Sequence, residues 1–292
     1  MKPICLLAVT IFAAFPSAAQ QQPRRPGLSA TGMAPDLNMP RPIDARDSLF
    51  IEELTWLEVR DAMRAGKTTV IISTGGVEQN GPYLASGKHN YVLRATTEAI
   101  ARKLGNALIA PIVAFVPEGE ISPPSSHMKY PATISLRQST FKALLTDIAE
   151  SFRSHGFQRM ILIGDSGGNQ AGMKEVAAEL SKKWAAGGGK AAIHFIPEYY
   201  DFYNSGTLSK WLESQGVHEV DEGHHDNVAI TAMMMAVDPG AVRMSERRAK
   251  GKFSINGVAL DPADKTIALG KKAIAFRTDI TVAAIRKAMG PR

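Results

Sequence analysis

Acidic residues and histidines gather in a few short segments of this 292-residue sequence. Imidazole nitrogens and carboxylate oxygens are ligands that suit zinc or manganese. Such an ion lowers the pKa of a bound water and polarises a carbonyl, which allows an amide to be hydrolysed without a covalent intermediate. Each residue on its own could instead cap a helix or tie a loop. The polar residues concerned are Glu78, Asn80, Tyr83, His89, Glu118, Glu120, His127, Asp165, Ser166, Asp221, Glu222, His224, His225 and Asp226.

The run GDSGGN at residues 164–169 suggests a second chemistry. It fits the G-x-S-x-G turn of α/β-hydrolases, in which the nucleophilic serine stands between a strand and a helix. It is also one letter short of the string around the nucleophile of trypsin-like proteases, but that fold is all-β and disulfide-bonded, and Cys5 is the only cysteine here. A metal-free serine hydrolase is therefore an alternative. Its triad would run from Ser166 to Asp201 or Asp221, and then to His224 or His225.

Alternating strands and helices must position these side chains. Short apolar runs predict buried strands over 68–74, 107–116, 159–164 and 191–196, and helical spacing of apolar residues predicts helices over 90–105, 139–156, 169–188, 207–215, 226–237 and 264–289. This alternation predicts an α/β fold with a parallel sheet covered on both faces. Ligands of such folds bind outside the carboxyl ends of the strands, where most of the polar residues above are expected.

The N-terminal segments and the net charge of the chain indicate its expected location and partners. Residues 1–19 have a basic start, a short apolar run and small residues, which predicts a secretory signal peptide and export to the periplasm or the medium, with no permanent membrane anchor. Residues 20–48 predict a flexible Pro/Gly-rich leader, and 49–292 a single domain. The net charge of +6 is scattered, and its densest cluster, residues 245–252, lacks aromatic residues, so we expect a surface loop and no nucleic-acid partner.

Five blocks of the sequence resemble the creatininase (creatinine amidohydrolase) family, in the family's order and from about Glu52 to Lys272. The first contains GGVEQNGPYLASGKHN and resembles the family's G-s-x-E-Q-H-G-P-H-L-P-x-x-x-D. The others are HMKYPATISL, SHGFQRMILIGDSGGN, GHHDNVAITAMMMAVDP and FSINGVALDPADKTIALGKK. The resemblance implies a three-layer α/β sandwich with a mostly parallel central sheet, amide hydrolysis by a water bound to two metals, and a homo-oligomer, often a hexamer.

The family's metal-ligand positions are altered in this chain. Glu78 is kept, whereas the other four positions hold Asn80 (usually His), His89 (usually Asp), Ser166 (usually His) and about Ile230 (usually Glu). Asp165 lies beside Ser166, and His225 or Asp226 at the start of the same helix could replace the ligand lost at Ile230. The expected centre is one divalent ion, zinc or manganese, held by Glu78, His89, Asp165 and His225, with two ions as the alternative.

The resemblance therefore favours an amidohydrolase that acts on C–N bonds other than peptide bonds, with a cyclic or linear amide as its small-molecule substrate. His225, Asp226 and His127 are the expected catalytic residues, and Asn169 is expected to cap the helix after the GDSGGN turn. A non-catalytic binding protein of the same fold is a further alternative to the serine hydrolase. The expected substrate-binding residues are Asn80, Tyr83, Ser166, Asn169 and His224.

Overall fold

A computed structural model describes residues 35–290 of the chain. The chain divides into two units, residues 1–43 and 44–292, and the second is described below. The predicted signal peptide lies outside the described residues, as does the leader up to residue 34. Residues 35–48 form turns and bends without a helix or strand.

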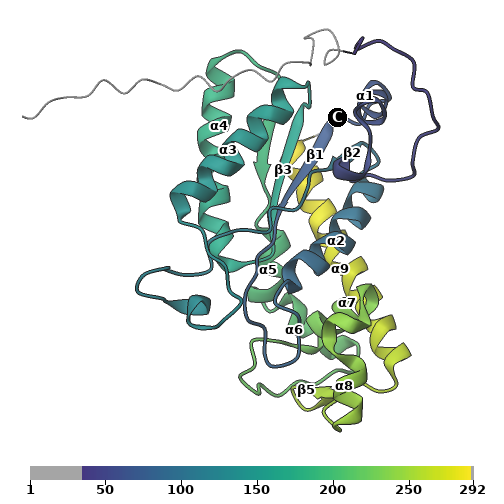
Figure 1. Ribbon diagram of the computed structural model, residues 1–292, viewed down its shortest axis with the longest axis vertical. Coiled ribbons are helices and arrows are strands. Elements are labelled where there is room, and N and C mark those ends of the chain that lie inside the picture. Colours follow the sequence, from purple (N-terminus) through teal and green to yellow (C-terminus); the bar gives the residue numbers. More distant parts are fainter. Residues whose placement is uncertain (1–34, 291–292) are drawn as a thin grey trace, which may run out of the picture. The chain divides into compact units, whose positions relative to one another are not determined.

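Four parallel strands form the central sheet (Figure 1), in the order β2-β1-β3-β4. These are β1 (Thr69–Thr74), β2 (Ala107–Ile109), β3 (Arg159–Gly164) and β4 (Ala192–Phe195). Thr69 of β1 is in register with Ala107 of β2 on one side and with Arg159 of β3 on the other. The chain thus moves outward from β1 to β2 and then returns to the opposite side of β1. This reversal between β1 and β3 creates the crevice in which open α/β sheets bind ligands.

Helices cover both faces of the sheet, as Figure 1 shows, which confirms the predicted three-layer α/β architecture. Helices α2 (Lys88–Leu104), α5 (Glu198–Asn204) and α9 (Ala263–Met289) lie on one face, and α3 (Gln138–Ser154) and α4 (Gln170–Ala186) on the other. The remaining elements are η2 (Ile51–Glu53), α1 (Trp56–Arg64), η3 (Ser126–Lys129), η4 (Gly167–Asn169), α6 (Thr207–Ser214), α7 (Val228–Val237), η5 (Pro239–Val242), α8 (Met244–Ala249), β5 (Ser254–Ile255) and β6 (Val258–Ala259).

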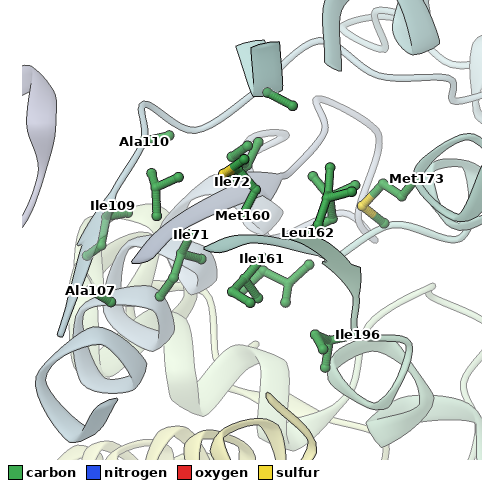
Figure 2. Close-up of a cluster of buried hydrophobic side chains, with 14 of the residues drawn as sticks. Ile71, Ile72, Ala107, Ile109, Ala110, Met160, Ile161, Leu162, Met173 and Ile196 are labelled. Carbon is green, nitrogen blue, oxygen red and sulfur yellow. The ribbon is translucent and has the colours of Figure 1, made fainter. Parts of the chain in front are cut away.

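The main core lies between the sheet and its helices. Every residue of β1 is buried, because both faces of this central strand are covered. Figure 2 shows Ile71 and Ile72 of β1 close to Met160, Ile161 and Leu162 of β3. Apolar side chains from both layers of helices pack against them. Because this core is closely packed, the strand ends that precede the polar residues are held in fixed positions.

Two sequence-based expectations differ from the structure. The second strand ends at Ile109 instead of continuing to residue 116, because Pro111 has no N–H to donate to the sheet. Residues 245–252 were expected as a surface loop, yet Met244–Ala249 form helix α8. Arg247 of this helix is buried, since its guanidinium stacks on Tyr83 and donates hydrogen bonds to two backbone carbonyls. Among residues 35–290, no helix has the length and apolar character needed to cross a membrane.

Candidate active site

The loops that follow the strands enclose a cavity of about 1140 Å³ at the carboxyl edge of the sheet. Glu78 comes from the loop after β1, Glu118 from the segment after β2, and Asp165 and Ser166 from the turn after β3. Nine of the polar residues singled out in the sequence line this cavity, namely Glu78, His89, Glu118, Glu120, His127, Asp165, Ser166, His225 and Asp226.

The buried carboxylate of Glu78 is the centre of the site. Its Oε1 lies 2.7 Å from His89 Nε2, 3.5 Å from Lys88 Nζ and 3.9 Å from His225 Nδ1. Its Oε2 lies 3.3 Å from His127 Nε2. Burial alone would raise the pKa of Glu78, but the hydrogen bond with His89 and the positive charges around the carboxyl hold that pKa well below its usual range.

His89 joins Glu78 to a second buried carboxylate. The Nδ1 atom of His89 lies 2.8 Å from Asp165 Oδ2. Asp165 in turn forms an ion pair of 2.6 Å with Arg277, which lies fully buried in α9 and also donates to the carbonyl of Tyr199 and the hydroxyl of Tyr203. Burial opposes ionisation of Asp165, but Arg277 and His89 together lower its pKa. Asp165 thus fixes the His89 ring from the side opposite Glu78.

Ser166 is bonded to a carboxyl group. Its Oγ donates to Glu118 Oε2 at 2.9 Å. Burial and the nearby charge of Glu78 raise the pKa of Glu118 to about 9, so this carboxyl is protonated at neutral pH.

Two glycines make the close approach of the loops feasible. A Cβ on Gly168 would lie 1.9 Å from the carbonyl oxygen of Pro117, and one on Gly76 would lie 2.1 Å from Glu118 Oε1.

Two groups of side chains in the described part of the chain could each hold a cation, and they share Glu78. One consists of Glu78, His127 and His225, and the other of Glu78, His89 and Glu118, with ligand atoms within 4.8 Å of one another in each group. Two buried atoms in them, His127 Nδ1 and Glu118 Oε1, have no hydrogen-bond partner among the described residues. Imidazoles, carboxylates and open polar atoms fit a divalent ion such as zinc or manganese.

The expected ligand set is only partly gathered around one point. Glu78 and His89 belong to one cation group, and Glu78 and His225 to the other. Asp165 belongs to neither group and instead contacts His89 and Arg277. The four-residue set therefore stays a prediction, with Asp165 placed as a support for His89.

The three expected catalytic residues lie together at the wall of the cavity. The rings of His127 and His225 are 4.5 Å apart between centroids. Burial lowers the pKa of His225, with a smaller contribution from the charge of Lys88. Burial raises the pKa of Asp226 to about 6, although Asp226 accepts hydrogen bonds from the Thr231 hydroxyl and the Asn227 N–H. Asp226 can therefore change protonation close to neutral pH, as acid–base catalysis requires.

Four expected substrate-binding residues do not line the cavity. Asn80 is buried and donates to the carbonyl of Glu78. Tyr83 packs under Arg247, and His224 lies edge-on to Tyr83. Asn169 stands at the start of α4 but makes no side-chain cap there, so the capping expectation was wrong. Its amide donates instead to Thr74 and to the carbonyl of Gly75, which ties the turn after β3 to the end of β1.

The sequence singles out Glu118 without a role and does not indicate Lys88 or Arg277 as site residues. Glu118 follows the second strand, which is a usable signal, and Lys88 is the neighbour of His89. Arg277 lies in the middle of a long helix, and only the tertiary fold brings it to Asp165.

The fold and the site define an α/β protein with a carboxylate–imidazole cavity at the carboxyl edge of a parallel sheet. Residues 52–285 match the family model of creatininase, described as creatinine amidohydrolase. This chain therefore belongs to the creatininase family. The family is metal-dependent and suggests hydrolysis of C–N bonds other than peptide bonds, as expected from the resemblance.

Individual relatives are distant. A creatinine amidohydrolase from Pseudomonas putida is 24% identical over 196 residues, which cover 67% of this chain and 74% of that protein. A 3-dehydro-scyllo-inosose hydrolase from Thermotoga maritima is 23% identical over 119 residues, or 41% of this chain and 36% of that protein. A solved creatinine amidohydrolase (creatininase) matches with a TM-score of 0.60 at 22% identity and covers 84% of this chain and 98% of that one, which supports the fold.

Proposed function

We propose that this protein is a metal-dependent hydrolase of a small cyclic or linear amide. The observation that carries the proposal is the buried Glu78 carboxylate, around which three histidines and a lysine converge from separate parts of the chain. Membership of the creatininase family and the P. putida relative support an amide as the substrate.

The ion would be held by Glu78 with histidine nitrogens. His225 is a ligand in both the set expected from the sequence and the group that contains His127. When bound, a divalent ion supplies positive charge that activates water and polarises a carbonyl. Zinc and manganese both accept imidazole and carboxylate ligands, and so either ion is proposed.

The side chains around the ion would transfer protons and orient the substrate. Asp226, with a pKa of about 6, would accept a proton from the attacking water at neutral pH and return it to the leaving nitrogen. His127 lies at the same wall of the cavity and is the second candidate for this transfer. The protonated carboxyl of Glu118 has an unpartnered Oε1, from which it would donate a hydrogen bond to the carbonyl oxygen of the amide.

The test is a hydrolysis assay on a panel of small amides, including creatinine, before and after chelation. We expect chelation to abolish turnover and added zinc or manganese to restore it. A Glu175→Gln variant is a suitable control, because Glu175 contacts Lys142 on the surface and lies outside the cavity. Turnover of the amides that survives complete removal of metal would refute the proposal.

Ser166 offers the competing chemistry of a serine hydrolase. Its hydroxyl is bonded to Glu118, and no imidazole among residues 35–290 makes a hydrogen bond to it, so the geometry favours the metal-dependent reading. Labelling of Ser166 by a fluorophosphonate would support the serine reading. Binding of an amide without turnover, with or without metal, would support a non-catalytic binding protein.

Export and assembly are further proposals that rest on the sequence and the family resemblance. Cleavage near Ala19 would give a mature periplasmic or secreted protein, and mass spectrometry of the exported chain would locate the new N-terminus. A homo-oligomer, up to a hexamer, would be detected by light scattering of the purified protein.

A further inference from the structure

Lys88 places a fixed positive charge inside the site. It is the first residue of α2 and is only 3% exposed. Its Nζ lies 3.5 Å from Glu78 Oε1, the same oxygen that contacts His89 Nε2. Lys88 lines the cavity together with the buried carboxyls of Glu118 and Asp165. Buried lysines are uncommon and need such partners.

The two cation groups differ in how many of their histidine nitrogens already have a partner. In the group of Glu78, His89 and Glu118, both ring nitrogens of His89 face carboxylate oxygens, and Lys88 shares an oxygen with that ring. In the group of Glu78, His127 and His225, the Nδ1 atom of His127 has no partner, and His225 stays 3.9 Å from Glu78. The second group is therefore the open one.

Two of the carboxylates on the His89 side already have cationic partners. Arg277 pairs with Asp165, and Lys88 pairs with Glu78. A divalent ion placed there would face the ammonium of Lys88 at close range in a buried setting, where repulsion is only weakly screened.

We propose that Lys88 acts as the resident cation on the His89 side of Glu78 and confines the metal to a single ion at Glu78, His127 and His225. This inference rests on the proposed function only in that the site takes a divalent ion. It replaces His89 and Asp165 of the expected ligand set by His127, and it gives a physical reason for a stoichiometry of one.

Metal stoichiometry tests the inference without any assay of activity. The apoprotein would be titrated with Zn²⁺ or Mn²⁺ by calorimetry, and bound metal would be counted by mass spectrometry. We expect one equivalent in the wild-type chain and a second equivalent, or at least tenfold tighter binding, in Lys88→Gln. Lys88→Arg keeps the charge and should stay at one, as should Lys142→Gln, a control on the surface. Two ions in the wild type, or one ion of unchanged affinity in Lys88→Gln, would overturn the inference.

Two further measurements separate this inference from the proposed function. The Mn²⁺-loaded wild type should give the electron paramagnetic resonance spectrum of a mononuclear ion, and a spin-coupled pair would overturn the inference even if the Lys88 variants did not fold. His127→Ala should lose the ion while His89→Gln keeps it, and the reverse would favour the His89 set. A wild-type chain that binds no metal would overturn both the inference and the proposed function.

Discussion

Arg277 of α9 forms a fully buried ion pair with Asp165, which lies beyond the end of β3, at 2.6 Å. The pair extends through His89 to Glu78, so a helix near the end of the chain supports the centre of the site. The guanidinium also stacks on the rings of Tyr199 and Tyr203. This chain of contacts makes the geometry of His89 depend on a residue that never touches the cavity.

Arg277→Gln should destabilise the protein strongly, because it leaves the Asp165 carboxylate buried without its partner. Loss of one member of a buried ion pair typically costs about 3–5 kcal/mol in the free energy of unfolding. Urea denaturation of the metal-free protein would measure this loss. Arg286→Gln, at a surface position of the same helix, should change the stability by less than about 0.5 kcal/mol. Equal effects of the two changes would contradict the structural role of Arg277.

Glu118→Gln tests the protonation of Glu118 through the pH dependence of stability. Because the folded-state pKa is raised to about 9 from an ordinary value of 4.5, the wild-type carboxyl stabilises the fold most at low pH and loses that contribution as pH rises from about 4.5 to 9. The glutamine has no such dependence. We therefore expect the stability difference between the metal-free proteins to shift steadily in favour of Glu118→Gln over this window. A difference that does not change with pH would mean that Glu118 has an ordinary pKa.

Ser166→Ala separates the two hydrolase chemistries. If the metal-dependent reading holds, the variant keeps amide turnover within about tenfold of the wild type, since only a hydrogen bond to Glu118 is removed. Loss of a serine nucleophile instead lowers kcat by about 10⁶-fold. Steady-state kinetics on a responsive amide would distinguish these outcomes, and a collapse of kcat with intact metal content would favour the serine reading.

Asp226→Asn should slow turnover without removing the metal. Proton transfer by a positioned carboxylate contributes about 10²–10⁴-fold to a rate. The amide of asparagine can still accept the hydrogen bond from Thr231, so folding should be little affected. The pH profile of kcat/KM in the wild type should fall on the acid side, as Asp226 with its pKa of about 6 becomes protonated. Unchanged kcat in the variant would assign the transfer to another group, with His127 as the next candidate.

The predictability of the site follows from how each residue is positioned. Glu78, Asp165 and Ser166 follow strands of a parallel sheet, and such strands end at one edge, so the sequence alone predicts that they meet. Arg277 carries no local signal, since a guanidinium in a long helix is normally solvated, and only packing of α9 brings it to Asp165. Tyr83 and Asn80 lie in the predicted loop but face away from the cavity, because side-chain direction in an irregular segment is set by tertiary contacts.

The bounds of the helices and strands are also only partly predictable from the sequence. The apolar run after residue 106 predicts a long strand, but Pro111 interrupts the hydrogen bonding that defines one. In α8, the charge cluster is typical of a surface loop, whereas the aromatic faces of Tyr83 and Phe253 bury Arg247. A local proline thus decides the first case, and contacts between distant segments decide the second.

Metal content of the wild-type chain and of Glu78→Gln tests the central claim most directly. Both proteins would be stripped, reloaded with zinc or manganese, desalted and analysed for bound metal, with Glu175→Gln as the control. We expect the wild type and the control to retain the ion and Glu78→Gln, folded by circular dichroism, to lose it, because Glu78 belongs to both cation groups. A folded Glu78→Gln variant that retains as much metal as the wild type would contradict the account.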